Sequence, residues 1–414
     1  MNFFKRGMKN SGILLIGRIL GMIISYATLI YIVRQLSVEE YGLISTVRTF
    51  VASFLIFSFG GISAAVMREG AKDISSMGLL YEKTNGFKLL MSMFAMLLCL
   101  IFLFFTPYPT TTKILILIFS TTIITTSLFN HWKEAFTASE NFKTIVFLKV
   151  FQPLMLLLIA TYIINHDNRV EYILYSQTFL QFLFMLICLF MAKIVIKFKL
   201  SFRSLIFDRS LITTGLYFFI ISFAGMIFMK IDVLMVSFIS DMQDVGIYSV
   251  ADKIAREGSE LRTVIIAGFF PVMIKRIKSG PISGRLVKRT VIKIFLLVFV
   301  GITIVSFYIE PIITLLLGSK YLASASILKY LIFFLAIEYS IYPYILLLLS
   351  STGEKKIAFI YSMLAIINII LNYTFFNNFG LIGIAFSTVI VFIILALYTL
   401  TFGINHLYNK GVLI

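Results

Sequence analysis

Residues 21–45, GMIISYATLIYIVRQLSVEEYGLIS, are echoed 204 positions later by residues 225–249, GMIFMKIDVLMVSFISDMQDVGIYS. Each stretch begins with a Gly-Met pair in an apolar run, passes through a short turn that carries acidic residues, and enters a second apolar run. Gly42 of the first copy aligns with Gly246 of the second. Internal repetition on this scale is typical of transport proteins that are built from two related halves.

Composition places these halves in a membrane. Of the 414 residues, 60% are hydrophobic and only 13% are charged, and the mean hydropathy of +1.00 is far above that of a soluble domain. One helical crossing of a bilayer needs about 20 mainly apolar residues. We therefore expect an all-α polytopic membrane protein with about 12 transmembrane helices. The predicted helices cover residues 13–33, 43–67, 87–105, 114–129, 144–164, 172–196, 211–239, 247–274, 286–308, 325–349, 357–376 and 381–406.

The repeat spacing predicts how these helices are grouped. The offset pairs the first two predicted helices with the seventh and eighth, so both halves enter the membrane from the same side. We expect an N-terminal six-helix lobe over residues 1–200 and a C-terminal six-helix lobe over residues 201–414. The division falls within the basic segment 193–209.

Basic residues set the expected orientation. With a cytoplasmic N-terminus, most of the 36 Lys and Arg residues fall in tails and connections on that side, including Lys83 and Lys88 at the boundary of the third predicted helix. The positive-inside rule therefore assigns both termini to the cytoplasm. The net charge of +17 then reflects topology and attraction to anionic lipids, and nucleic-acid binding is disfavoured. The outer connections contain only Arg34, Lys113, Arg169 and Lys320.

Ionisable residues inside the predicted helices are the main candidates for functional groups. Each costs at least about 2.5–3.5 kcal/mol on insertion, so we expect them to face protein or water instead of lipid. The bases outnumber the acids, which predicts a polar cavity with net positive charge. The bases are Arg18, Arg48, Lys149, Lys230, Lys253, Arg256, Arg262 and Lys329, and the acids are Asp232, Asp252, Glu257, Glu260 and Glu338.

The eighth predicted helix, residues 247–274, carries six of these charges. At 100° per residue most of them share one face, so this helix is amphipathic across the membrane. Residues one turn apart on a helix are neighbours and can neutralise each other. The pairs expected from this spacing are Asp252 with Arg256, Arg256 with Glu260, and Lys253 with Glu257, whereas Arg262 has no such partner.

Three stretches carry a resemblance to a known family: LIYIVRQLSVEEYGLIS at 29–45, PIITLLLGSKYLASASILKYL at 311–331 and STGEKKIAFIYSMLAIINIILNYTFFNNFGLIGIAFST at 351–388. With twelve predicted helices in two lobes, the chain resembles the MOP superfamily, and within it the Wzx-type polysaccharide flippases. The resemblance implies a MATE-like fold. It also implies a bacterial inner-membrane flippase that moves polyprenyl-pyrophosphate-linked oligosaccharide to the outer leaflet, by alternating access through a cationic cavity between the lobes. Both an O-antigen (lipopolysaccharide) unit and a capsule unit fit this description.

The charged residues fit such a substrate. A pyrophosphate diester is an anion, and the planar fork of arginine matches phosphate oxygens. We expect Arg18, Arg48 and Arg256 to contact the pyrophosphate at successive stages. The alternative for Arg18 is a snorkelling contact with lipid head groups, and for Arg256 a structural place among the ion pairs. The remaining cavity-lining candidates are Lys149, Lys230, Asp252, Lys253, Glu257, Glu260, Arg262 and Lys329.

Two energy sources are compatible with the sequence. The membrane potential favours outward movement of an anion by about 2.3 kcal/mol per charge per 100 mV. Coupling to H⁺ or Na⁺ is the second option, with Asp232 and Glu338 as candidate carboxylates, because a buried acid can hold a cation in one state and release it in another. Alternatively, these acids neutralise Lys230 or Lys329. We expect no other cofactor and no metal site.

Two other classes of function fit the sequence less well. A MATE-type multidrug exporter shares the fold, but its organic cations favour an acidic cavity. A membrane enzyme such as a polysaccharide polymerase or glycosyltransferase should show a large outer domain or a metal-binding acid cluster, and the sequence predicts neither. No HExxH or GxSxG motif is present either, so we do not expect an enzyme. The expected partners are the glycolipid, membrane lipids, and a polysaccharide polymerase or glycosyltransferase, around a monomer.

Overall fold

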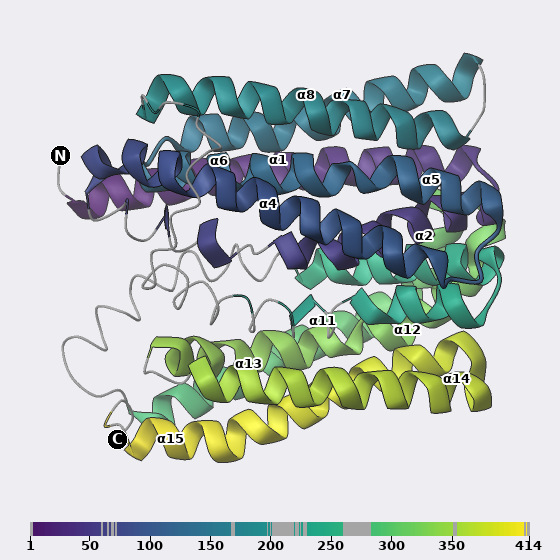
Figure 1. Ribbon diagram of the computed structural model, residues 1–414. Helices are drawn as coiled ribbons and strands as arrows, with labels where there is room; N and C mark the ends of the chain where they lie inside the picture. The colour runs from purple at the N-terminus through teal and green to yellow at the C-terminus, as the bar shows by residue number, and fades with distance from the viewer. Residues whose placement is uncertain are drawn as a thin grey trace. The chain divides into compact units, whose positions relative to one another are not determined.

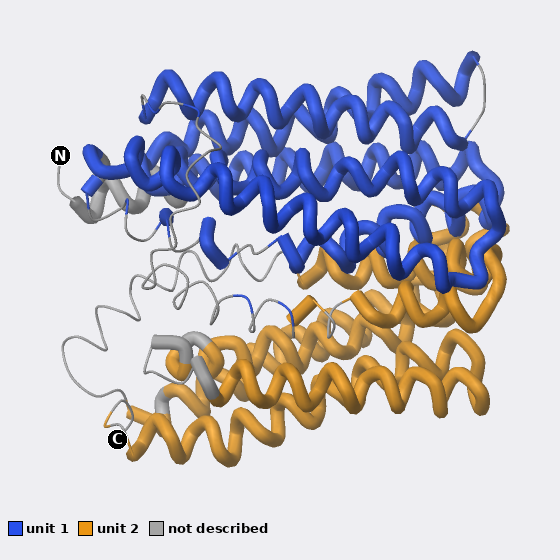
Figure 2. The backbone as a smooth tube through the Cα atoms, viewed as in Figure 1, with its two compact units in different colours: residues 1–223 blue, residues 224–414 orange. Residues whose placement is uncertain are grey.

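The computed structural model describes most of the chain. The described residues are 3–58, 61–63, 66–67, 70, 73–166, 170–196, 198, 200, 219, 223, 225–226, 230–259, 283–350, 354–409 and 411. Over these residues the regular secondary structure is entirely helical (Figure 1). The chain divides into two compact units, unit 1 from Met1 to Phe223 and unit 2 from Ala224 to Ile414 (Figure 2). The predicted lobe boundary at residue 200 adjoins the segment 201–218, which lies outside the described residues, so it stays a prediction.

Unit 1 is a bundle of long helices around an aromatic core. Tyr81, Trp132, Phe136 and Phe184 are buried together at its centre. Helix α1 packs along α7, and α6 packs between α4 and α8. The helices are α1 (Phe3–Gln35), α2 (Val38–Leu55), α4 (Met77–Phe104), α5 (Thr110–Ser120), α6 (Thr122–Ala138), α7 (Phe142–His166) and α8 (Val170–Ile196), with short 3₁₀ turns at Ile56–Ser58 and Ile74–Ser76.

Small residues allow the close packing of α1 on α7. A Cβ atom placed on Gly17 would lie 2.3 Å from the side chain of Val146, and one on Gly21 would lie 3.2 Å from the carbonyl oxygen of Lys149. A side chain at Gly17 would therefore push the two helices apart. This contact fixes the position of Arg18 beside α7.

Unit 2 contains two helical segments, residues 230–239 and 242–259, followed by a second group of long helices. Helix α14 packs against α12 and α13, and α11 packs against α13. Phe334 stacks on Phe392 with ring centroids 4.8 Å apart. The long helices are α11 (Gly284–Leu317), α12 (Leu322–Leu331), α13 (Phe333–Ser350) and α14 (Glu354–Tyr398), which continues through a π-helical turn (Thr399–Gly403) into α15 (Ile404–Asn409).

The repeat is visible in the way two helices begin. At the start of α2, the Ser37 side chain accepts a hydrogen bond from the backbone N–H of Glu40 (3.1 Å), and Glu40 accepts one from the N–H of Ser37 (2.7 Å). At the matching position in unit 2, Asp241 accepts a hydrogen bond from the N–H of Asp244 (2.8 Å). The acidic turns that the two sequence copies share are therefore helix caps.

The helix count agrees with the predicted fold class. Within the described residues, nine segments are long and apolar enough to cross a membrane. One of them, Lys356–Asn409, comprises two predicted helices joined at Gly380, whose φ of 60° breaks the helical geometry. The helical residues 230–239 and 242–259 lie in two further predicted spans. The protein is an all-α, multi-pass membrane protein.

Several predicted helix ends differ from the structure, among them those of α4 and α11. Helix α4 begins at Met77, ten residues before the predicted start, so Lys88 lies well inside it and is only 1% exposed. Its assignment to a cytoplasmic connection is wrong, because its ammonium group donates a hydrogen bond to the carbonyl oxygen of Ser58 (2.9 Å). Helix α11 continues past the predicted end at residue 308 to Leu317, because the residues that follow are mostly apolar and Pro311 is tolerated within the helix.

Candidate functional site

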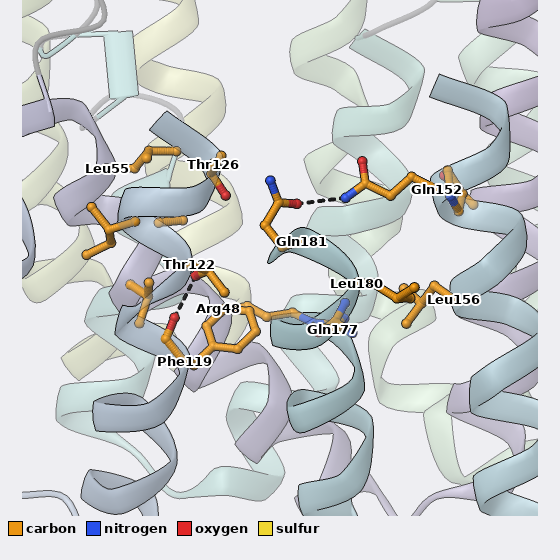
Figure 3. A pocket seen from close by; sticks show the side chains of 15 residues that line it. Arg48, Leu55, Phe119, Thr122, Thr126, Gln152, Leu156, Gln177, Leu180 and Gln181 are labelled. Atoms are coloured by element: carbon orange, nitrogen blue, oxygen red, sulfur yellow. Dashed lines mark hydrogen bonds between the residues drawn. The ribbon is translucent and has the colours of Figure 1, made fainter. Parts of the chain in front are cut away.

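Unit 1 contains an open cavity of about 400 Å³ between α1, α2, the α5–α6 break, α7 and α8 (Figure 3). Arg48 from α2 supplies its only charged side chain among the described lining residues. Amide and hydroxyl groups share the lining with aliphatic side chains. The lining residues are Ser25, Arg48, Val51, Ala52, Leu55, Phe119, Thr122, Ile123, Thr126, Gln152, Pro153, Leu156, Gln177, Leu180 and Gln181.

Arg48 is held by a neutral partner. Its Nε–H donates a hydrogen bond to Oε1 of Gln177 on α8 at 2.9 Å. A guanidinium has five N–H donors, so four remain after this bond. No carboxylate in the described part of the chain forms an ion pair with it, which leaves a positive charge on the cavity wall that an anion could neutralise.

A pair of hydrogen-bonded amides also lines this cavity. Gln152 of α7 donates a hydrogen bond from Nε2 to Oε1 of Gln181 at 2.7 Å. Gln181 follows Gln177 by one helical turn, so α8 presents both amides to the cavity, and Figure 3 shows Gln152 and Gln181 pointing toward each other. The cavity is therefore lined by one cation and three amides.

Unit 2 contains a buried ionic cluster. Arg256 donates from Nε to Asp252 at 2.6 Å and from Nη2 to Asp232 at 3.0 Å. The Asp232 side chain is 0% exposed, and its two oxygens also accept hydrogen bonds from Asn372 (2.8 Å) and Thr388 (2.9 Å). One guanidinium thus bridges two carboxylates from neighbouring helices, and polar side chains of α14 donate further hydrogen bonds to Asp232.

Only part of this cluster was predicted from the sequence. The predicted pair of Asp252 and Arg256 is confirmed. Asp232 binds Arg256, a contact that was not predicted, and its candidate role in binding a coupling ion stays a prediction. Asn372 and Thr388 were missed. The available signal was a pair of asparagines one turn apart, Asn368 and Asn372, in an apolar helix, and these two amides are hydrogen-bonded (2.6 Å).

The other acidic candidates have separate partners. Glu338 is 2% exposed and accepts a hydrogen bond from the Ser259 hydroxyl at 2.6 Å. The predicted pair of Lys253 and Glu257 is confirmed at 2.5 Å. Lys329 pairs with Glu310 of α11 at 2.5 Å, and both side chains are about a third exposed or more. Glu260 and Arg262 lie outside the described residues, so the predicted pair of Arg256 with Glu260 stays a prediction.

The remaining predicted bases are Arg18 and Lys149 in unit 1 and Lys230 in unit 2. Arg18 is partly buried on α1, and Lys149 on α7 is close enough for their charges to interact. Lys230 lies near Arg256 and Lys253. Among the described residues, no group of His, Cys, Asp and Glu is arranged to hold a metal ion.

Sequence reasoning also missed a buried polar group in unit 1. His131 is 0% exposed and lies between the hydroxyls of Ser63 (3.0 Å) and Thr84 (3.2 Å). Trp132 donates to the side chain of Asn85 (2.9 Å), one turn before Lys88. These contacts join α4 to α6 and have the character of a structural polar core.

Comparisons with known proteins agree with this architecture. Residues 8–277 match the family described as polysaccharide biosynthesis protein. Among solved structures, the lipid II flippase MurJ in an inward closed conformation has a TM-score of 0.69 at 18% identity, covering 98% of this chain and 88% of that one. An inward-facing multidrug resistance MATE family transporter of the MOP superfamily has a TM-score of 0.70 at 13% identity, covering 96% and 98%.

A third solved structure is a MOP superfamily transporter from Pyrococcus furiosus, with a TM-score of 0.66 at 13% identity and coverage of 98% and 96%; its description reports a reversed polarity of the binding pocket. Identities this low establish a shared fold. A comparison with curated protein sequences finds no significant match.

Proposed function

The chain belongs to the polysaccharide biosynthesis protein family, and from this membership and the MOP-type fold we propose that it is a flippase. Its substrate in this proposal is a polyprenyl-pyrophosphate-linked oligosaccharide, an O-antigen or capsule repeat unit. The protein moves this glycolipid from the cytoplasmic to the outer leaflet of a bacterial inner membrane by alternating access. It acts as a transporter and not as an enzyme.

The observation that carries this proposal is the environment of Arg48. A cation within a membrane-spanning helix is costly unless it is paired, yet the described partner of Arg48 is the neutral amide of Gln177. A pyrophosphate group carries about two negative charges and binds well to a guanidinium fork. We assign Arg48 as a pyrophosphate contact in unit 1, and we keep Arg18 and Arg256 as contacts at other stages of transport.

Arg256 needs an additional step to serve this role. In the described conformation its guanidinium is bound to Asp232 and Asp252, so substrate must displace at least one carboxylate. The displaced carboxylate would then require another cation, and H⁺ or Na⁺ can fill that place. This step is our proposal for coupling at Asp232, with Glu338 as the second candidate carboxylate. The membrane potential supplies the remaining driving force.

A MATE-type exporter of organic cations is the alternative function for this fold. The unit 1 cavity argues against it, because its described lining contains Arg48 and no carboxylate. An organic cation would meet like charge there, which disfavours binding. The glycolipid proposal also extends to partners, namely a polysaccharide polymerase or glycosyltransferase that acts on the same lipid-linked intermediate.

Reconstitution in liposomes tests the proposal directly. Purified protein is placed in vesicles that contain a fluorescent polyprenyl-pyrophosphate oligosaccharide, and exposure of the glycan to an added glycosidase is followed. We expect fast exposure with the native protein and at least a tenfold slower rate with Arg48→Ala, since a charge-assisted hydrogen bond is worth about 1.5–3 kcal/mol. Arg34→Ala, which removes an exposed arginine at the end of α1, is the matched control.

Two outcomes would contradict the proposal. Native protein that exposes glycan no faster than protein-free vesicles would remove the flippase function. If such protein still accumulated a cationic dye in inside-out vesicles, the exporter function would replace it.

A further inference from the structure

Two glutamines of the unit 1 cavity, Gln152 and Gln181, are hydrogen-bonded to each other and not to Arg48, and they are the pair from which a further function follows. Gln152, Gln177 and Gln181 come from two adjacent helices and all line the same space as Arg48. All three residues are partly buried, and an amide withdrawn from water needs hydrogen-bond partners. Three amides around one cavity therefore match a ligand with several neutral polar groups.

The hydrogen-bond inventory shows what these amides can still bind. Each glutamine amide has two N–H donors and a carbonyl with two acceptor positions. The bond from Gln152 to Gln181 (2.7 Å) uses one donor and one acceptor position. Among the described residues these two side chains make no other hydrogen bond, so donors and acceptors remain on both. Such a mixed set matches hydroxyl and N-acyl groups, which also donate and accept.

One threonine of the cavity, Thr122, is less available. The Thr122 hydroxyl donates to the carbonyl oxygen of Phe119 at 2.6 Å, as Figure 3 shows, so its proton is already in use. The aliphatic lining includes Pro153, Leu156 and Leu180, which offers an apolar surface to the C–H face of a sugar ring. A volume of about 400 Å³ is within the range of small-molecule pockets.

The position of the glutamines relative to Arg48 indicates which sugar of the glycolipid would lie beside them. Gln177 is hydrogen-bonded to Arg48 (2.9 Å), and Gln181 is one turn further along the same helix. A lipid whose pyrophosphate contacts Arg48 would therefore bring its first sugar, the one bonded to the pyrophosphate, beside the amides. Sugars further from the lipid would lie beyond this group.

We propose that Gln152 and Gln181 form a sugar subsite that reads the hydroxyl or N-acyl groups of the sugar attached directly to the pyrophosphate. This inference rests on the proposed flippase function and adds a determinant of substrate selectivity to it. Arg48 supplies affinity for any polyprenyl pyrophosphate, and the amides supply preference among the first sugars.

Binding measurements on the full-length protein in detergent test this division. The probes are undecaprenyl pyrophosphate without sugar and the same lipid carrying one N-acetylglucosamine, N-acetylgalactosamine, glucose or galactose. Native protein should bind at least one single-sugar lipid about tenfold more tightly than the bare lipid, which is the effect of two net hydrogen bonds. In the double variant Gln152→Met and Gln181→Met, this ratio should fall to about one while affinity for the bare lipid is retained.

Controls separate the subsite from general damage. Methionine keeps the length of glutamine and removes its hydrogen bonds, and each single variant is measured in case the double variant fails to fold. Gln35→Met, at the exposed end of α1, should leave every affinity unchanged. Arg48→Ala should weaken all five lipids together.

Each contrary outcome has a distinct meaning. Native protein that binds all five lipids equally would overturn the sugar subsite and leave the flippase proposal intact. Equal weakening of bare and sugar-bearing lipids in the glutamine variants would assign these residues to the pyrophosphate or to folding instead. Native protein that binds none of the lipids would overturn the proposed function and the subsite with it.

Discussion

Arg48 in unit 1 and Asp252 in unit 2 occupy equivalent positions in the two sequence copies, 204 residues apart. In unit 1 the position holds a cation whose described partner is a neutral amide, on the wall of a cavity. In unit 2 it holds a carboxylate that, like Asp232, binds the guanidinium of Arg256, one turn later. The comparison teaches that two helices with corresponding, capped starts differ in electrostatic role. Unit 1 presents a cation to a ligand, whereas unit 2 pairs its cation with two carboxylates.

The largest difference between the two units should appear in how much protein stability depends on the arginine of each. Replacing Arg256 by Met leaves Asp232 and Asp252 without their shared cation, and removing one partner of a buried ion pair typically costs about 3–5 kcal/mol. Arg48→Met, by contrast, leaves only the Gln177 carbonyl, which can bind water in the cavity, so we expect a loss below about 1 kcal/mol. Urea unfolding in detergent, followed by far-UV circular dichroism, measures both variants. Equal losses in the free energy of unfolding would show that both arginines stabilise the fold to the same extent, and would contradict this difference between the units.

A smaller effect should follow from making unit 1 resemble unit 2. Gln177→Glu places a carboxylate where Arg48 now meets an amide, and the two side chains have nearly the same shape. The new ion pair should lower the affinity for undecaprenyl pyrophosphate about tenfold, since the guanidinium is then already neutralised. The neutral control Gln177→Met should lower it less. Unchanged affinity in the glutamate variant would mean that Arg48 does not meet the anion.

Local patterns in the sequence were sufficient for much of this architecture. Apolar runs located the helices, because each membrane crossing must bury about the same length of hydrocarbon-compatible chain. The one-turn spacing of Asp252 and Arg256, and of Lys253 and Glu257, was enough to predict two ion pairs that the structure contains. Such pairs depend only on helix geometry, which the sequence determines locally.

Contacts between helices were not predictable in the same way. Asp232 meets Arg256 across 24 positions and meets Thr388 across 156, and no local spacing encodes those distances. Lys88 was misassigned for a related reason: polar residues such as Glu82, Lys83 and Asn85 interrupt the hydropathy of α4, although Asn85 is buried by contacts with other helices. The unit 1 glutamines likewise have no charge and no motif, so only their shared cavity reveals them.

The smallest expected effect lies on the same helix as the buried cluster. Lys253 and Glu257 form an ion pair at 2.5 Å, but the lysine side chain is 48% exposed. Pairs at this spacing contribute about 0.3–0.5 kcal/mol, and the order with lysine first is the weaker one. Lys253→Gln should therefore reduce the free energy of unfolding by less than about 0.5 kcal/mol in the same urea assay. Glu257→Gln should give the same small loss, and 0.5 M salt should remove the difference from native protein. A loss above about 1 kcal/mol would place Lys253 inside the buried network. A loss below about 0.5 kcal/mol would mean that the two units differ through the buried group of Asp232, Arg256 and Asp252. The number of charges on the helix would then not explain the difference.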